Sequence, residues 1–242
     1  MSDNIEFNYP FIKGQGRHSS RLLFDFSIAI SAIKEDISNR KNLDFACGTG
    51  WTSELLNRIC SLDVYGTDID LEAIEFSKKR ALCDNRIDLS KYNMSVQDGH
   101  VINFENGYFS HIFCFDSLHH MRDYTSVFQE MYRVLQPGGR AIFVEPGSCH
   151  SQSPETINFL KENNFGDWWI EKDVNLIEIN SIICNIGFKP LFIKPFLLPS
   201  MVDYTLNDWI HIKDNQIGIN NHLNELRRFN YENRVIFYFD KP

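Results

Sequence analysis

The segment Leu43–Gly50 constrains the fold of this chain more than any other stretch of its sequence. Apolar residues lead into two glycines, and the periodicity of a helix begins at about Thr52. Gly48 and Gly50 tolerate positive φ angles and lack a Cβ atom, so a ligand can approach the backbone closely at this turn. The helix that follows directs free N–H groups at the same place. The pattern therefore predicts a strand, a turn and a helix, with a ligand site at the turn.

The wider element pattern predicts a parallel sheet. Strands and helices alternate from about residue 42 to residue 145, which indicates βαβ units. Pro137-Gly138-Gly139 is expected to end the last helix of this series. Two later strands would add a hairpin-like end to the sheet, one of them antiparallel. The predicted strands are 42–46, 63–68, 92–97, 111–115, 140–145, 188–196 and 234–239, and the predicted helices are 19–37 (beginning at Ser19 or Ser20), 52–59, 71–82, 124–135 and 175–186.

Length and charge limit the partners of this chain. Its 242 residues are enough for one large α/β domain or two small ones, and its net charge is −8. Nucleic-acid-binding proteins usually carry a basic surface, whereas the short basic clusters here, Lys78-Lys79-Arg80 and Arg227-Arg228, are expected on solvated helix faces. Nucleic acid is therefore not expected as a partner. No apolar run approaches the ~18 residues of a membrane span, and no signal-peptide pattern is present, so a cytoplasmic protein is expected.

The six cysteines do not indicate a zinc site. No two of them form a C-x-x-C pair, so no metal is predicted. Cys114 and Cys184 lie in apolar runs and are predicted to be small core residues. Asp116, Glu145 and the histidines are still able to converge in space, which leaves a metal requirement open. The oligomeric state, monomer or homodimer, is also open.

Two acidic residues accompany the glycine turn. Asp44 precedes Gly48 by four positions, and Asp68 ends the next predicted strand. This combination resembles motif I of the class I S-adenosylmethionine (SAM)-dependent methyltransferases, Asp-x-x-x-Gly-x-Gly. The resemblance implies a doubly wound, Rossmann-like α/β fold with a seven-stranded, mostly parallel sheet of order 3-2-1-4-5-7-6, one antiparallel strand, and helices on both faces. It also implies SAM as the cofactor, held at this turn by Asp44, Ala46, Cys47, Gly48 and Gly50.

Binding of a nicotinamide dinucleotide is the alternative function for such a turn. The G-x-G-x-x-G motif of that class requires a third glycine and a close approach to a pyrophosphate. Ser53 stands at the position of the third glycine, and the bulky Trp51 stands where the pyrophosphate would approach. SAM carries no phosphate, so the methyltransferase interpretation is favoured. Binding of SAM without binding of dinucleotides would exclude the dehydrogenase.

Further cofactor contacts are predicted at the ends of the next strands. A carboxylate ~20 residues after the glycine turn can accept hydrogen bonds from ribose hydroxyls, and the resemblance assigns this role to Asp68, with Ile69 beside it. Asp70 is instead predicted to be the N-cap of the following helix. Asp98 and Gly99 resemble the adenine-contacting motif of the family, and an ordinary Asp-Gly turn is the alternative.

The segment after the fourth strand carries candidate catalytic residues. Phe113–Met121 resembles the fourth-strand motif of the family, and the run before the fifth strand resembles its RVLxPGG sequence. Ligands of open α/β sheets bind at the carboxyl ends of strands, so Phe115 and Asp116 are predicted beside the cofactor. His119 and His120 are candidates to position the acceptor or take its proton, and a structural role for one of them is the alternative.

His150, just after the fifth strand, is the preferred candidate for a general base. Glu145 and His150 are expected on the acceptor side of the cleft, and a solvated loop histidine is the alternative. The sequence of residues 145–150 is similar to that of methyltransferases that accompany surface-polysaccharide assembly. A cap over the acceptor is expected from residues 1–20, 150–175 and 199–232. Candidates to line its pocket are Trp168, Trp169 and Trp209, and packing within the core or cap is the alternative for them.

The predicted function is methyl transfer from SAM to an oxygen, or to a nitrogen, of a small molecule or saccharide, in polysaccharide or secondary-metabolite biosynthesis. Residues 1–242 are expected to form a single domain whose SAM-binding core spans about 40–146. A SAM-binding scaffold or sensor without catalysis is the alternative, because cofactor motifs alone do not separate the two. The acceptor is not predicted, because the cap carries no motif.

Overall fold

The computed structural model describes residues 16–162, 169–194, 220, 223–224 and 234–242. Its centre is a seven-stranded sheet of order β3-β2-β1-β4-β5-β7-β6. Strands β1 to β5 are parallel, whereas β7 runs antiparallel to β5 and β6. The predicted strand order and the single antiparallel strand are confirmed. The strands are β1 (Lys41–Phe45), β2 (Asp63–Asp68), β3 (Tyr92–Val96), β4 (Phe109–Phe115), β5 (Leu135–Pro146), β6 (Phe192–Ile193) and β7 (Arg234–Asp240).

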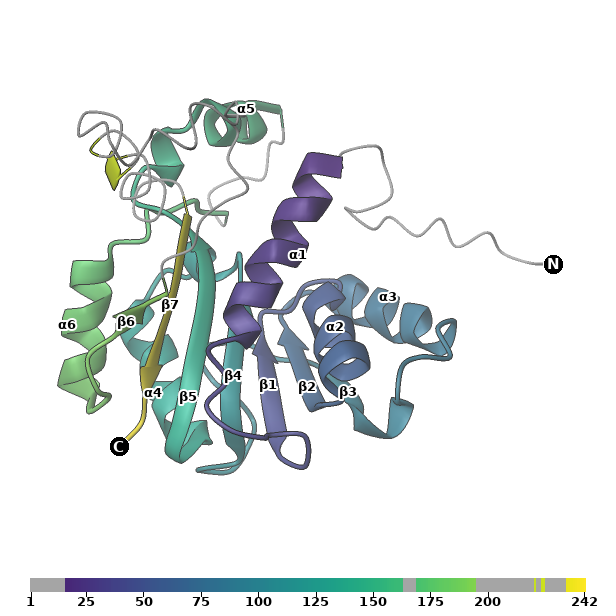
Figure 1. Cartoon of the computed structure of the whole chain (residues 1–242). Helices are drawn as coiled ribbons and strands as arrows, with labels where there is room; N and C mark the ends of the chain where they lie inside the picture. The colour runs from purple at the N-terminus through teal and green to yellow at the C-terminus, as the bar shows by residue number, and fades with distance from the viewer. Residues whose placement is uncertain (1–15, 163–168, 195–219, 221–222, 225–233) are drawn as a thin grey trace.

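Helices cover both faces of the sheet, as Figure 1 shows. One face carries α1 (Gly16–Ile30), α2 (Trp51–Cys60) and α3 (Leu71–Leu82), and the other carries α4 (Tyr124–Val134) and α6 (Leu176–Ile186). Helix α5 (Pro154–Glu162) lies beyond the carboxyl ends of the parallel strands. Short 3₁₀ turns form at η1 (Leu89–Lys91), η2 (Leu118–His120) and η3 (His150–Gln152).

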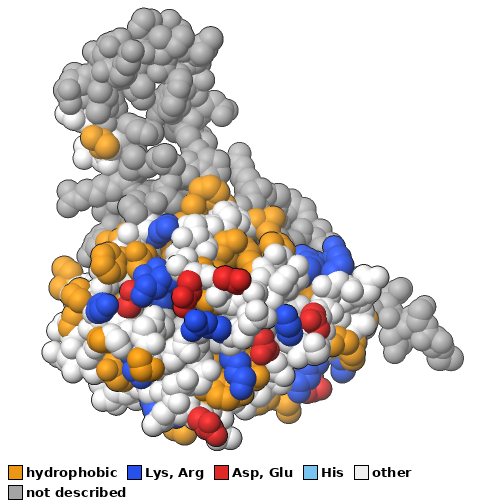
Figure 2. Space-filling model, turned by 60° about the horizontal axis from the view of Figure 1, so that its bottom comes forward, with side chains coloured by type: hydrophobic (Ala, Val, Ile, Leu, Met, Phe, Trp, Pro, Cys, Tyr) orange, Lys and Arg blue, Asp and Glu red, His pale blue; other side chains and the backbone are white. Residues whose placement is uncertain are grey.

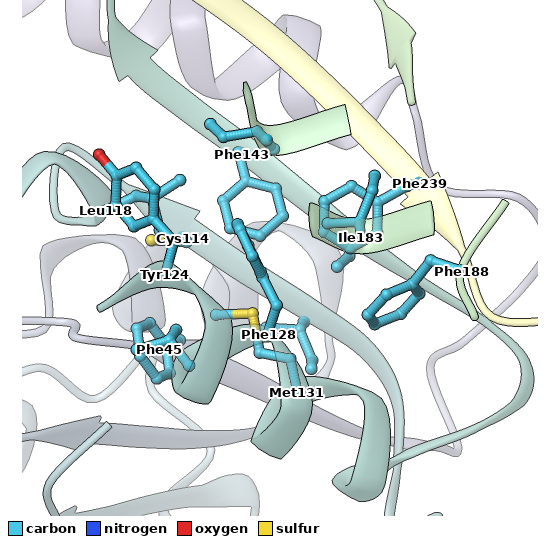
Figure 3. Packing of buried hydrophobic residues seen from close by; sticks show 14 of the residues in the cluster. Phe45, Cys114, Leu118, Tyr124, Phe128, Met131, Phe143, Ile183, Phe188 and Phe239 are labelled. Atoms are coloured by element: carbon cyan, nitrogen blue, oxygen red, sulfur yellow. The ribbon is translucent and has the colours of Figure 1, made fainter. Parts of the chain in front are cut away.

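The core follows from this layering. All seven residues of β4 are buried, because a central parallel strand with helices on both faces has no solvated side. On the α4 and α6 face, Phe128 and Met131 pack with Phe143 and Ile183, as Figure 3 shows. Each fully buried side chain of this size contributes about 1.5–3 kcal/mol relative to exposure. The packing holds the carboxyl ends of the strands in a rigid frame for the site.

The predicted helix that ends before Pro137-Gly138-Gly139 is confirmed, with its end one residue earlier than Leu135. Helix α4 already stops at Val134, and β5 begins at the next residue. The backbone N–H of Gly138 donates to the carbonyl of Lys241, and the N–H of Lys241 donates to the carbonyl of Gly139. These hydrogen bonds join the segment to the end of the chain, and Gly138 adopts a φ angle of 78°, which glycine tolerates.

Other boundaries also differ from the sequence predictions. Helix α1 ends at Ile30 rather than at about Ile37. Strand β6 covers just Phe192–Ile193, and the last two residues of the predicted strand 188–196 lie outside the described residues. Cys114 is buried as predicted, but Cys184 is exposed on α6, so its prediction as a core residue is wrong. The apolar run around Cys184 belongs to a helix that buries one face alone.

The surface carries both signs of charge. Figure 2 views the molecule from below the orientation of Figure 1, and there Lys and Arg side chains are interspersed with Asp and Glu. Such mixing is typical of a solvated surface. Among the described residues, no helix combines the length and apolar character that crossing a membrane requires.

Candidate functional site

A cavity of about 800 Å³ opens at the carboxyl ends of the central strands. The strand order reverses between β1 and β4, which is where ligands bind in open α/β sheets. Most of the residues that the sequence singled out line this cavity: Ala46, Cys47, Gly48, Asp68, Ile69, Asp98, Gly99, Phe115, Asp116 and His120. Asp44, Gly50, His119 and His150 are not among the lining residues.

The glycine turn is held against the end of β2. Gly48 and Gly50 have φ angles of 52° and 74°, in the left-handed region that glycine tolerates. The N–H of Gly48 donates to Asp68 Oδ2 at 2.7 Å. A Cβ atom on Gly50 would lie 2.2 Å from Ser77 Oγ, so a larger residue does not fit there. Backbone and carboxylate therefore form one fixed wall of the cavity.

Asp68 is oriented before any ligand arrives. Its Oδ1 accepts from the N–H of Asp70 at 2.9 Å, while its Oδ2 accepts from Gly48. Each carboxylate oxygen retains acceptor capacity for a hydroxyl in the cavity. Asp70 Oδ1 accepts from the N–H groups of Glu72 and Ala73, which confirms Asp70 as the N-cap of α3.

Arg80 supports the turn from beneath, contrary to the prediction that its basic cluster lies on a solvated helix face. Lys78 and Lys79 are exposed, but Arg80 is only 2% exposed. Its Nε donates to Glu54 Oε1 at 2.5 Å, and its Nη2 donates to the carbonyl of Thr49 at 2.7 Å. The partners lie 26 and 31 positions away in sequence, so the local charge run did not reveal them.

Asp44 lies beneath the turn rather than in the cavity wall. It is fully buried, and its Oδ2 accepts from Thr52 Oγ1 and Ser53 Oγ, both at 2.6 Å. In this structure Asp44 therefore fixes the first turn of α2. Burial, with a smaller contribution from the nearby charge of Asp68, raises the pKa of Asp44 to about 6, although the two hydroxyl hydrogen bonds oppose this shift.

Glu145 organises the turn η2 from the end of β5. Its side chain is fully buried, and its Oε1 accepts from the N–H groups of Ser117 and Leu118 at 3.1 and 2.9 Å. Its Oε2 lies 2.8 Å from His119 Nδ1. The sequence predicts Glu145 on the acceptor side of the cleft. In the structure it is buried, and it supports the loop that carries His119 and His120.

A buried arginine fixes the end of β4. Arg234, the first residue of β7, donates through Nε to Asp25 Oδ2 at 2.9 Å and through Nη2 to Asp116 Oδ2 at 2.9 Å. A second, shorter hydrogen bond joins Arg234 Nη1 to Asp116 Oδ1. These contacts link α1, β4 and β7, and Asp116 lines the cavity. The sequence signal for Arg234 was a charge at the head of an otherwise apolar strand.

The three candidate histidines occupy different positions. His120 lines the cavity, and its Nδ1 lies 2.8 Å from the carbonyl of Ile170. His119 is 5% exposed and lies between Glu145 and Glu171. Although burial alone lowers the pKa of His119, the hydrogen bonds that its ring donates to the carboxylates of Glu145 and Glu171 raise it to about 9. His150 Nε2 lies 2.7 Å from Glu171 Oε2 and faces this carboxylate.

Residues 43–143 match the family model described as a methyltransferase domain. The strand order and the glycine turn at the end of β1 agree with that match. This part of the chain is therefore similar to a methyltransferase domain. The match favours the methyltransferase over the dinucleotide-binding alternative.

Curated relatives of the methyltransferase domain differ in the compounds that their names give. A probable chloroplastic tocopherol O-methyltransferase of Oryza sativa subsp. japonica is 28% identical over 154 residues, covering 60% of this chain and 42% of that protein. A demethylmenaquinone methyltransferase of Lactococcus lactis is 32% identical over 114 residues, covering 46% and 43%. The chain thus spans less than half the length of these relatives.

Solved structures share the fold of this chain. Phosphoethanolamine N-methyltransferase 2 of Haemonchus contortus, in complex with SAM, superposes with a TM-score of 0.64 at 18% identity, covering 91% of this chain and 52% of that one. Geranyl diphosphate C-methyltransferase of Streptomyces coelicolor A3(2), in complex with Mg²⁺, geranyl diphosphate and S-adenosylhomocysteine, gives a TM-score of 0.64 at 15% identity, covering 91% and 77%.

Glu171 is a residue of the candidate site that the sequence did not reveal. It contacts both His119 and His150, and its Oε1 accepts from Trp169 Nε1 at 2.8 Å. Nothing in the local sequence separates Glu171 from neighbouring acids such as Asp173. Trp169, a predicted pocket residue, does line the cavity, whereas Trp168 and Trp209 lie outside the described residues.

Replacing Asp44 with asparagine is expected to change how stability depends on pH. The folded-state pKa of about 6 exceeds the ordinary aspartate pKa of 3.8, so the folded state holds this proton more tightly. The wild type therefore loses stability, relative to Asp44→Asn, as pH rises from about 4 to about 6, by roughly 3 kcal/mol. Asparagine still accepts from Thr52 and Ser53 but carries no charge. Urea unfolding of both proteins between pH 4 and 8 measures this difference, and a difference independent of pH would contradict it.

Proposed function

We propose that this chain transfers the methyl group of SAM to an oxygen of a small molecule, saccharides included. The supporting observation is the shared cavity, which has the glycine turn and Asp68 on one side and His120 and Trp169 on the other. One wall offers the groups that a ribose and a methionine require, and the opposite wall offers room for an acceptor. Methyl transfer requires that SAM and the acceptor be held in line, and this alignment alone lowers the reaction barrier by several kcal/mol.

The cofactor assignments in this proposal follow the cavity wall. Asp68 accepts from the ribose hydroxyls, because its carboxylate is already held by Gly48 and Asp70. Asp98 and Gly99 face the adenine. Asp98 Oδ1 now accepts from the N–H of His100 at 2.9 Å, and Asp98 Oδ2 remains to accept from the exocyclic amine. The electrophilic methyl group then points toward the side that carries His120.

The acceptor assignments depend on the opposite wall. His120, Arg122 and Trp169 line this part of the cavity, and Trp169 lies over His120 with ring centroids 4.5 Å apart. The names of the relatives include O-, N- and C-methyltransferases, so an oxygen acceptor is our proposal for this chain. A hydroxyl loses its proton as the new bond forms, which calls for a polar group at this wall. The predicted cap fits this position, because Trp169 and Ile170 come from the segment 150–175.

Two measurements test the proposed function. Calorimetric titration with SAM and S-adenosylhomocysteine is expected to show micromolar binding, and nicotinamide dinucleotides are expected not to bind. Transfer of label from SAM to a panel of hydroxylated small molecules and saccharides, with amines as comparators, then identifies the acceptor atom. Absence of SAM binding by the wild type would refute the proposal. SAM binding without transfer to any acceptor class would favour the scaffold or sensor.

Replacing His120 with glutamine is expected to lower kcat for methyl transfer by about 100-fold while leaving SAM affinity unchanged. His120 is the candidate catalytic residue that reaches the cavity, and loss of a positioned acid–base or polar group typically costs 10²–10⁴-fold. The matched control is His100→Gln, which alters a cavity histidine at the adenine side and should leave kcat within about 3-fold. Equal effects of both substitutions on kcat would contradict the assignment.

A further inference from the structure

We propose that His119, His120 and Glu171 bind one divalent transition-metal ion, zinc being the best match, beside the acceptor wall of the cavity. Each residue offers a ligand atom, and these atoms all lie within 4.8 Å of one another. His119 is buried and the other two are half-buried. His120 belongs both to this site and to the proposed acceptor wall, so the inference rests in part on the proposed function, and the site can be tested without cofactor or acceptor.

The spacing of the ligand atoms fits a small coordination sphere. His119 Nε2 lies 3.3 Å from Glu171 Oε2, and His120 Nδ1 lies 3.7 Å from Glu171 Oε1. Two ligands that each sit ~2.0–2.1 Å from a tetrahedral zinc ion are roughly 3.4 Å apart. These two pairs involve different oxygens of Glu171, and His120 Nδ1 also lies 2.8 Å from the carbonyl of Ile170. Small side-chain rotations would bring one atom of each residue to the ion.

Neighbouring groups orient the ligands in the way that metal sites require. Glu145 Oε2 lies 2.8 Å from His119 Nδ1, so the other ring nitrogen faces Glu171. A carboxylate behind a metal-binding histidine fixes its tautomer and strengthens it as a ligand. Trp169 Nε1 donates to Glu171 Oε1 and fixes this carboxylate in turn. Glu145 and Trp169 therefore hold two of the three proposed ligands, His119 and Glu171, in place.

Charge and ligand type select the class of ion. Glu145 and Glu171 place two carboxylates on either side of His119, with side-chain exposures of 0% and 6%. Buried negative charge of this kind requires compensation, which His119 and His150 supply in part and a bound cation would complete. Two imidazoles and one carboxylate suit zinc and neighbouring transition metals, whereas Mg²⁺ and Ca²⁺ prefer oxygen ligands. Three protein ligands leave a coordination position open, and His120 lines the cavity that an acceptor oxygen would enter.

Metal binding to the full-length protein provides the test. After dialysis against a chelator, calorimetric titration with ZnCl₂ is expected to show one site with a Kd of 10 µM or tighter, while MgCl₂ gives no saturable heat. Titration with CoCl₂ is expected to produce the visible absorption of a nitrogen- and oxygen-coordinated ion. The absence of saturable zinc binding by the folded wild type would overturn the proposal. So would a cobalt thiolate charge-transfer band, because it would place the ion on cysteines.

Substitutions locate the ion. Glu171→Gln and His119→Ala are each expected to weaken zinc binding by at least 30-fold, and Glu145→Gln by about 10–100-fold, because it removes the support of His119. His100→Ala, a cavity histidine outside the cluster, should leave the Kd within about 3-fold. Circular dichroism of each variant shows whether it is folded. Zinc binding that survives unchanged in both folded ligand variants would overturn the site, whereas SAM titration of the wild type tests the proposed function separately.

Discussion

Replacing Asp68 with alanine is expected to lower the affinity for SAM by at least 100-fold. The substitution removes the carboxylate that we assign to the two ribose hydroxyls, and hydrogen bonds to a charged group contribute about 1.5–3 kcal/mol each. It also removes the acceptor of the Gly48 N–H, which lies 2.7 Å from Oδ2. The glycine turn would then lose its link to β2. Both effects reduce the affinity, so the combined loss is larger than that of the hydroxyl contacts alone.

Asp70→Ala is the matched control for this experiment. Asp70 also lines the cavity, but its Oδ1 accepts from the N–H groups of Glu72 and Ala73 at the start of α3. Loss of this N-cap is expected to lower the free energy of unfolding by about 1 kcal/mol and to leave SAM affinity within about 3-fold. Calorimetry measures the affinity and urea unfolding the stability. Micromolar binding by a folded Asp68→Ala variant would remove Asp68 from the cofactor site.

Replacing Arg234 with methionine is expected to lower the free energy of unfolding by about 3–5 kcal/mol. Arg234 is 2% exposed and donates to two carboxylates, Asp25 on α1 and Asp116 at the end of β4. Methionine fills a similar volume, so the loss would come from leaving two carboxylates near each other without their shared cation. Because Asp116 lines the cavity, the variant should also bind SAM more weakly. Urea unfolding monitored by circular dichroism measures the change.

An exposed ion pair provides the comparison for Arg234. Lys78 Nζ lies 3.0 Å from Glu75 Oε1, with both side chains nearly half exposed. Lys78→Ala should change the free energy of unfolding by less than about 0.5 kcal/mol, because solvent screens such pairs. A loss below about 1 kcal/mol for Arg234→Met would show that the two carboxylates do not depend on this arginine.

The sequence by itself determined the elements and motifs whose signals are local. The glycine turn after β1, the N-cap at Asp70 and the largely apolar strand β4 each depend on residues within a few positions of one another. Periodicity and capping report such short-range relationships directly. The strand order came from the family resemblance instead, since periodicity does not state which strands are neighbours.

Tertiary structure alone decided which polar side chains meet at the site. Arg80 reaches Thr49 across 31 positions, Glu145 reaches His119 across 26, and Arg234 reaches Asp116 across 118. It also decided that His120, rather than the preferred His150, lines the cavity, because Glu171 holds His150 at 2.7 Å. A polar side chain buried by folding needs a partner. The packing of the sheet and helices determines which partner each side chain meets. The sequence around either residue does not predict that partner.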